Sequence, residues 1–182
     1  MQFTCESSSF QKGVATVQNI AQSKIDNPMV MNILMEAAEN QIIFTGTNLA
    51  QSIRTVIQAE VETEGRVAVP AKFIGEIARE MDKGPLKVIL SRNRLQLNCG
   101  KTEARLGVIP PEDFPEFQPL RKGTQVVFTT TEIKDIIRKT LFCTSEEKGR
   151  FELDAVRMEV RPDAMDFVAS DGRRMSVIQL KR

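Results

Sequence analysis

With 182 residues, 41% of them hydrophobic and 27% charged, the chain has the length and composition of a globular protein that buries a core of its own. Its formal net charge is only +1, which excludes a protein that binds nucleic acid through overall basicity, so any attraction to phosphates must come from local groups of lysine and arginine. The chain has no histidine, which removes the commonest general base and metal ligand.

The start of the chain lacks a basic segment followed by an apolar one, and no apolar run is long enough to cross a membrane. The three cysteines, Cys5, Cys99 and Cys143, are widely spaced and odd in number. This pattern favours buried free thiols in a cytoplasmic protein over a disulfide framework or a zinc site. We therefore expect no metal and no cofactor.

The first expected module covers residues 1–58 and begins with a short strand at Phe3-Thr4. An amphipathic helix should follow the serines at 7–9, because apolar residues recur at spacings of four and three: Phe10, Val14, Val17 and Ile20. Strands are expected over residues 30–37, 41–45 and 51–59, with turns at Asn40 and at 46–48.

The second expected module covers residues 59–118 and repeats this order of elements. A strand over 66–70 ends at Pro70, and helical periodicity follows from Phe73 to Met81. Strands are expected over 86–90, 94–99 and 103–109. Residues 110–119 contain four prolines and should form an extended linker, because proline resists helices and central strands.

The third expected module runs from 121 to 182, with a strand over 125–129 and a helix capped by Thr130 or Thr131. Strands should follow over 151–160, 165–169 and 175–180, with a tight turn at 170–173. A shift of 123 residues lays Met35-Glu36 on Met158-Glu159 and Phe44 on Phe167. The repeat predicts an α+β fold of strand-helix-three-strand units with antiparallel sheets, in which two modules close one domain and the third lacks a partner.

Two groups of residues are candidates for function from the pattern alone. Asp171-Gly172-Arg173-Arg174 is either a hairpin turn with solvated arginines or a loop that contacts a peptide or a phosphate. Basic residues on the expected helices either form an ordinary solvated face, since acidic residues are interleaved with them, or a weak positive lining. The glycine-containing turns are too short for a phosphate-binding loop.

Five short motifs then occur in register along the whole chain: Phe3-Thr4, Phe44-Thr45-Gly46-Thr47-Asn48-Leu49, Val69-Pro70-Ala71-Lys72-Phe73, Asp113-Phe114-Pro115 and Val168-Ala169-Ser170-Asp171-Gly172-Arg173-Arg174-Met175. Together they resemble the bacterial sliding clamp family, the beta subunit of DNA polymerase III, whose chains are about twice as long. The resemblance implies a complete first clamp domain over 1–120 and the first half of a second over 121–182.

The resemblance further implies a DNA polymerase processivity factor rather than an enzyme. Family members form head-to-tail homodimeric rings in the DNA-clamp fold, with antiparallel sheets outside and helices lining the inner face. The implied partners are double-stranded DNA without sequence preference, the DNA polymerase III alpha subunit, the clamp loader and other proteins with a clamp-binding motif.

Two sets of site residues follow from the resemblance. The implied DNA contacts are Lys12, Lys24, Lys72, Arg79, Lys134, Arg138, Lys148 and Arg150. Glu146 and Glu147 depart from the polar contact residues of some members, which leaves Lys148 and Arg150 as the candidates in that loop. The implied wall of a partner-peptide pocket consists of Leu153, Ser170, Gly172, Arg173, Arg174 and Met175.

Two other functions remain open at this point. A small enzyme could work with carboxylates alone, but the missing histidine and the lack of a convergent acid-base motif count against it. A protein-interaction module of repeated α+β units without a DNA role is the alternative, and the motifs in register favour the clamp over it.

Overall fold

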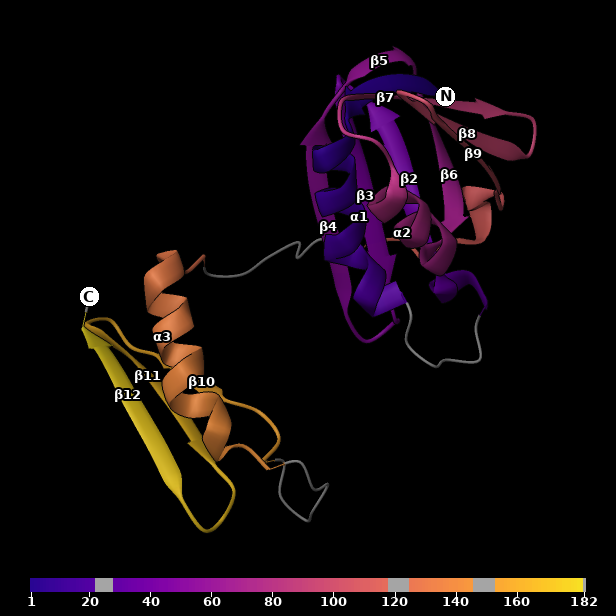
Figure 1. The fold of residues 1–182 in the computed structure, drawn as a ribbon. Coiled ribbons are helices and arrows are strands. Elements are labelled where there is room, and N and C mark those ends of the chain that lie inside the picture. The colour runs from indigo at the N-terminus through magenta and orange to yellow at the C-terminus, as the bar shows by residue number, and fades with distance from the viewer. Residues whose placement is uncertain (22–27, 118–124, 146–152, 182) are drawn as a thin grey trace. The chain divides into compact units, whose positions relative to one another are not determined.

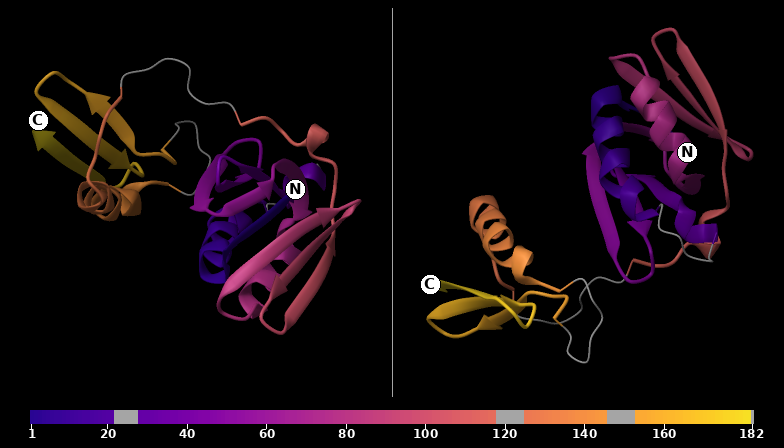
Figure 2. Two further views of the ribbon diagram at one scale, coloured as in Figure 1. Left: turned by 90° about the horizontal axis from the view of Figure 1, so that it is seen from above. Right: turned by 60° about the horizontal axis from the view of Figure 1, so that its bottom comes forward.

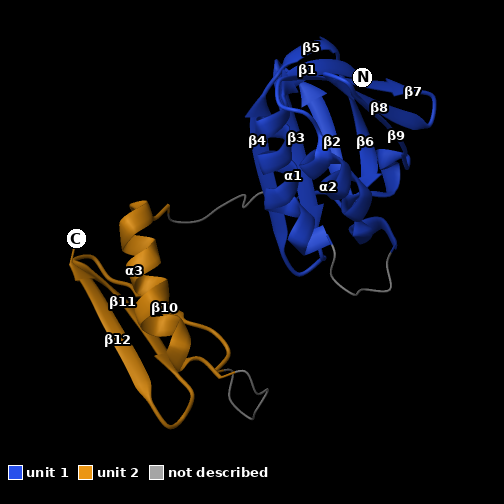
Figure 3. Cartoon of the chain, in the orientation of Figure 1, with its two compact units in different colours: residues 1–119 blue, residues 120–182 orange. Residues whose placement is uncertain are grey.

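A computed structural model describes residues 1–21, 28–117, 125–145 and 153–181. The chain divides into two compact units, unit 1 (Met1–Pro119) and unit 2 (Leu120–Arg182), shown in different colours in Figure 3. We expected a domain boundary between residues 120 and 121. Within the described residues, no helix combines the length and the apolar character needed to cross a membrane.

Unit 1 contains two modules with the same order of elements (Figure 1). The first module comprises β1 (Gln2–Glu6), α1 (Ser7–Ala21), the 3-10 helix η1 (Pro28–Met31), β2 (Asn32–Ala38), β3 (Gln41–Thr47) and β4 (Ser52–Gln58). The second comprises β5 (Glu60–Thr63), β6 (Gly65–Pro70), α2 (Ala71–Glu80), β7 (Pro85–Ser91), β8 (Arg94–Cys99) and β9 (Thr102–Gly107). Apart from β5 and η1, these are the elements that the sequence predicted, most of them with shifted ends; residues 30 and 31, expected at the start of a strand, belong to η1.

Each module of unit 1 contributes the strand that directly precedes its helix, β1 or β6, to the sheet of the other module. β1 leaves its own module and pairs with β7 in the sheet β5-β1-β7-β8-β9, while β6 pairs with β2 in the sheet β4-β3-β2-β6. All of these pairs are antiparallel. The registers match as well, because Glu6 lies opposite Pro85 and Pro70 lies opposite Asn32. In both cases the last residue before a helix pairs with the first residue of the strand that follows the helix of the other module, β7 or β2.

The core of unit 1 lies between these sheets and the two helices, which run side by side (Figure 2). The buried rings of Phe10 on α1 and Phe44 on β3 meet edge to face, with centroids 5.4 Å apart. A Cβ atom on Gly46 of β3 would lie 2.7 Å from the backbone oxygen of Val17. Helix α1 therefore approaches the sheet closely because residue 46 has no side chain.

Strand β5 was not predicted. Its sequence is dominated by glutamate, which is typical of a solvated loop rather than of a strand. It nevertheless pairs with β1, with Val61 opposite Phe3, and Glu62 forms a 3.3 Å ion pair with Lys87. As an edge strand of the five-stranded sheet, β5 tolerates the charges that a central strand would exclude.

Part of the expected linker is packed against unit 1. Ile109 and Ala68 exchange backbone hydrogen bonds of 2.9 and 3.2 Å, and a 3-10 helix, η2 (Pro111–Asp113), follows. Phe114 is buried in a small cluster with Leu34 and Ala68. The expectation of an extended linker was therefore wrong for residues 111–113, because burying the ring of Phe114 draws this part of the chain onto the sheet.

Unit 2 is a single module. Helix α3 (Thr130–Thr140) and the 3-10 helix η3 (Leu141–Cys143) precede the antiparallel sheet β10-β11-β12, formed by β10 (Arg157–Val160), β11 (Ala164–Ser170) and β12 (Met175–Lys181). Its core contains the buried Ile136, Met165 and Phe167, and the ring of Phe128 lies 5.8 Å from that of Phe167.

Three expectations for unit 2 need correction. Residues 125–129 do not form a strand, and β10 begins at Arg157 rather than at 151. In unit 1 the strand before each helix pairs with the other module, whereas the described residues of unit 2 form one module only. The cap of α3 is Thr129, not Thr130 or Thr131, because Thr129 and Glu132 form a reciprocal capping box.

The close approach at Gly46 gives a test of this packing. We expect Gly46→Ala to lower the free energy of unfolding by about 1–3 kcal/mol, since a methyl group there forces α1 away from β3. The matched control is Gly107→Ala at the end of β9, where a Cβ atom meets nothing within 4 Å. Urea unfolding followed by far-UV circular dichroism measures both. Equal stabilities of the two variants would contradict the close approach.

Candidate functional site

The turn between β11 and β12 is organised by one carboxylate. The backbone N–H groups of Arg173 and Arg174 each donate a 2.9 Å hydrogen bond to Oδ1 of Asp171, and Nε of Arg174 donates one of 2.8 Å to Oδ2. Gly172 has a φ of 85°, a conformation that favours glycine. Ser170 closes the turn, because its hydroxyl donates to the carbonyl of Arg174 at 3.0 Å.

These hydrogen bonds lower the pKa of Asp171 to about 2. The largest cause is the bond from the backbone N–H of Arg173, followed by that from Arg174; the side chain and charge of Arg174 add less. The carboxylate is thus ionised and saturated with donors at neutral pH. Its role is to hold the turn, and it is a poor candidate for a general base.

A hollow of about 710 Å³ lies beside this turn. Its floor and walls come from the segment after α3 and from the turn itself, and they consist of Leu141, Phe142, Thr144, Ser145, Asp171, Arg173 and Arg174. The guanidinium of Arg174 lies 5.5 Å from the centre of the Phe142 ring. Leu141 and Phe142 are both more than half exposed. The hollow therefore offers apolar surface next to two cationic groups.

The structure brings together only part of the implied peptide wall. Arg173 and Arg174 line the hollow, while Ser170 and Gly172 shape the turn behind it. Leu153 borders it through a 2.8 Å hydrogen bond from the N–H of Ser145 to its carbonyl. Met175 is 67% exposed at the start of β12 and does not line the hollow.

Sequence reasoning missed the other half of this hollow. Neither Leu141 nor Phe142 was among the residues that the sequence marked as candidates for a site. Both directly follow the last residue of α3, Thr140. An apolar pair just after a helix end is a signal by which the sequence could have indicated an apolar binding surface. The 3-10 helix η3 turns these side chains out of the helical pattern.

The basic residues on the helices of unit 1 are exposed. Lys12 lies on α1, and Lys72 and Arg79 lie on α2, seven residues apart. Within the described part of the chain, no ion pair involves any of the three. Their charges are therefore available to solvent and to a polyanion.

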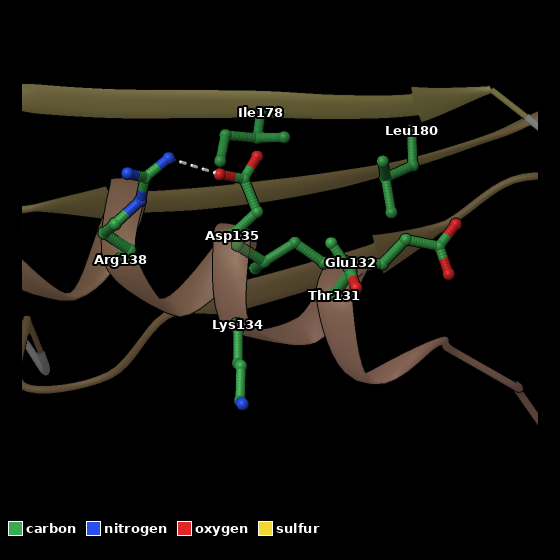
Figure 4. A pocket seen from close by; sticks show the side chains of 8 residues that line it. Thr131, Glu132, Lys134, Asp135, Arg138, Ile178 and Leu180 are labelled. Atoms are coloured by element: carbon green, nitrogen blue, oxygen red, sulfur yellow. Dashed lines mark hydrogen bonds and ion pairs between the residues drawn. The ribbon is translucent and has the colours of Figure 1, made fainter.

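Helix α3 differs in this respect. Arg138 and Lys139 both pair with Asp135, at 2.7 and 2.5 Å, and these bonds lower the pKa of Asp135. Figure 4 shows Lys134 pointing away from the strands and Arg138 reaching toward Asp135, at a groove of about 450 Å³ between α3 and β12. Lys134 is therefore a better candidate for a phosphate contact than Arg138. Lys24, Lys148 and Arg150 lie outside the described residues.

Comparison with known proteins decides the family. Residues 1–118 match the family described as "DNA polymerase III beta subunit, N-terminal domain". The chain belongs to this family. The beta sliding clamp of Vibrio cholerae is 30% identical over 181 residues, which are 98% of this chain and 50% of that protein.

Solved structures of DNA polymerase III beta subunits share the fold. The match to the Caulobacter crescentus structure covers 100% of this chain and 50% of the Caulobacter chain, with 26% identity and a TM-score of 0.90. A clamp of Bartonella birtlesii, bound to griselimycin, covers the same shares with 23% identity and a TM-score of 0.92. The expected DNA-clamp fold is confirmed, and the chain spans about half the length of the curated relatives it matches.

The hydrogen bonds in the β11–β12 turn predict how Asp171 titrates. We expect Asp171 to titrate with a pKa of about 2 in carboxyl-detected NMR, against ~3.9 in an unstructured peptide. A lowered pKa means that the carboxylate favours the folded turn fully above pH ~4, and that this contribution disappears as the pH falls through about 2.

Two variants separate the causes of that shift. Arg174→Ala should leave the pKa of Asp171 below its ordinary value, because the two backbone hydrogen bonds are the largest causes of the lowered pKa and remain in this variant. Gly172→Ala strains a backbone with a φ of 85° and should raise the pKa toward the ordinary value. An ordinary pKa in Arg174→Ala would mean that the side chain, not the backbone, holds the carboxylate.

Proposed function

We propose that this chain is part of a ring-shaped sliding clamp, a processivity factor that encircles duplex DNA and tethers the replicative polymerase. The observation that carries the proposal is the membership of residues 1–118 in the beta subunit family, together with a fold shared over the whole chain with solved clamps. The relatives are clamps, accessory subunits of a polymerase, and the proposal includes no bond chemistry.

The exposed cations of unit 1 fit this function. Lys12, Lys72 and Arg79 lie on two helices that run side by side, as expected for a lining that faces DNA. A net charge of +1 supplies only weak attraction to phosphates. A closed ring needs only this weak attraction, because its closure around the duplex prevents dissociation. Weak contacts to phosphates, which do not read the bases, also permit sliding.

The hollow beside the β11–β12 turn is proposed as one wall of a site for partner peptides. Its apolar surface at Leu141 and Phe142 suits the hydrophobic anchors of a short linear motif. Arg173 and Arg174 can donate to backbone carbonyls or to acidic side chains of such a peptide. The polymerase alpha subunit, the clamp loader and other proteins with a clamp-binding motif are the proposed partners.

Topology distinguishes the clamp from an interaction module. At the full length of its relatives and after loading by a clamp loader, the protein should stay on nicked circular DNA and leave it within seconds after linearisation. Gel filtration of the labelled protein with the DNA measures retention. Equal retention on both forms would reject the ring, and no retention on either would favour the interaction module.

A binding assay on short linear DNA, where the ring gives no topological hold, tests the helix charges. Lys72→Glu combined with Arg79→Glu should weaken this binding in fluorescence anisotropy and lower the slope of its salt dependence by about two phosphate contacts, or ~1.8. Arg94→Glu, on β8 of the five-stranded sheet, is the matched control and should change little. If all charge reversals act alike, the helices do not face the DNA.

The peptide site has its own test. Arg173→Ala should weaken binding of a fluorescent clamp-binding peptide from the alpha subunit by about five- to thirty-fold, which corresponds to ~1–2 kcal/mol. Met175→Ala should have a smaller effect, because Met175 lies outside the lining of the hollow. Arg157→Ala, an exposed arginine on β10, serves as the control. Unchanged affinity for Arg173→Ala would reject this pocket.

A further inference from the structure

The segment that follows β9 crosses one face of the four-stranded sheet of unit 1. Ile109 pairs with Ala68 on β6, and η2 lies beside the same strand (Figure 1). Further along, the ring of Phe117 lies 4.4 Å from the guanidinium of Arg54 on β4. Because β6 and β4 stand at opposite ends of the sheet β4-β3-β2-β6, residues 109–117 reach from one side of it to the other. We call this segment the strap.

The strap lies on the face of the sheet opposite the main core. Successive side chains of a strand point to opposite faces, and Ile33 on β2 belongs to the main core, so Leu34 points to the other face. Leu34 is opposite Ala68 on one side and Thr45 on the other, and Thr45 is opposite Arg54. These four side chains form a row across the sheet, and the strap follows that row.

The strap is held at two points of unequal strength. The ring of Phe114 is 4% exposed and packs with Leu34 and Ala68 in an apolar cluster. The ring of Phe117 is half-buried and has the guanidinium of Arg54 over its face. Full burial of a phenylalanine ring stabilises a structure more than a cation–π contact at a partly exposed site does. The contact of Phe114 should therefore persist when that of Phe117 is lost.

The side chain of Arg54 is positioned for this contact by two neighbours. Its Nε donates a 3.3 Å hydrogen bond to the hydroxyl of Thr45, and its Nη2 lies 3.9 Å from Oε2 of Glu36. Arg66, on β6, lies 3.8 Å from the other oxygen of the same carboxylate. Arg54 and Arg66 thus share one ionic partner from opposite sides of the sheet, and Phe117 stacks on Arg54.

We propose that the strap is fastened in two stages: Phe114 is a lasting anchor, and the contact of Phe117 with Arg54 is a latch that opens without it. Opening the latch frees residues 115–117, which adds about 10 Å of extended chain to the connection between unit 1 and unit 2. A longer connection lets the two units change their orientation. A ring that opens to admit DNA and then closes around it requires such freedom, and this consequence alone rests on the proposed function.

A single fluorophore tests the latch. The chain contains no tryptophan and no tyrosine, so the indole of Phe117→Trp is the one source of tryptophan fluorescence. Acrylamide quenching then gives the ratio of open to closed latch. Adding Arg54→Gln should raise this ratio about two- to fivefold, as expected for the loss of a cation–π contact. Adding Arg66→Gln instead, which removes only a contact with Glu36, should leave the ratio nearly unchanged. Equal ratios in all three proteins would overturn the latch.

Hydrogen exchange tests the anchor in the chain that keeps Phe117. The backbone N–H groups of Ile109 and Ala68 bind each other's carbonyls, and that of Phe114 is also hydrogen-bonded. In Arg54→Gln, NMR should find these three groups exchanging as slowly as in the unaltered chain. Faster exchange of all three would mean that the strap leaves the sheet in one piece, which contradicts two stages. Both measurements are made without DNA, so their failure leaves the tests of the clamp on DNA unaffected.

Discussion

The exchange between modules of the strands that precede the helices, β1 and β6, is the constraint on which the rest of this structure depends. β1 completes the sheet of the second module and β6 completes that of the first, so neither module of unit 1 can satisfy its own strand edges. The exchange brings α1 and α2 side by side over one shared core, which contains residues from both sheets and both helices. The two modules are thus linked by backbone hydrogen bonds between strands as well as by the apolar core. The same rule explains unit 2, where a single module leaves residues 125–129 outside every sheet and β10 short.

The hollow beside the β11–β12 turn depends on the local chemistry of that hairpin. The carboxylate of Asp171 binds two backbone N–H groups and the guanidinium of Arg174, and Gly172 supplies the conformation that the turn requires. Because Nε of Arg174 donates to Asp171, the guanidinium is held near the Phe142 ring, while the side chain stays 59% exposed to solvent. Arg173 has only its backbone N–H engaged by Asp171, which leaves its side chain as the more adaptable donor for a partner.

Much of this architecture was predictable from periodicity. The apolar spacing of Phe10, Val14 and Val17 predicted α1, and the ends of β8 were predicted to the residue. The sequence could not predict which strands pair, since pairing between modules leaves no local signal; β5 and the missing strand at 125–129 are both consequences of it. At the site, the turn was predictable because aspartate and glycine specify it. Leu141 and Phe142 were not, because their place in the hollow depends on the 3-10 turn that follows α3.

The distribution of charge fits the proposed clamp better than a high overall charge would. On α3, Asp135 engages both Arg138 and Lys139, whereas Lys12, Lys72 and Arg79 remain available on the paired helices of unit 1. A protein that holds DNA by affinity alone needs many such cations, and each added phosphate contact slows movement along the duplex. A ring that holds DNA by closure needs only enough positive charge to keep the duplex centred. In such a ring the stability of the module-to-module contacts, rather than the strength of the phosphate contacts, sets how long the protein stays on DNA.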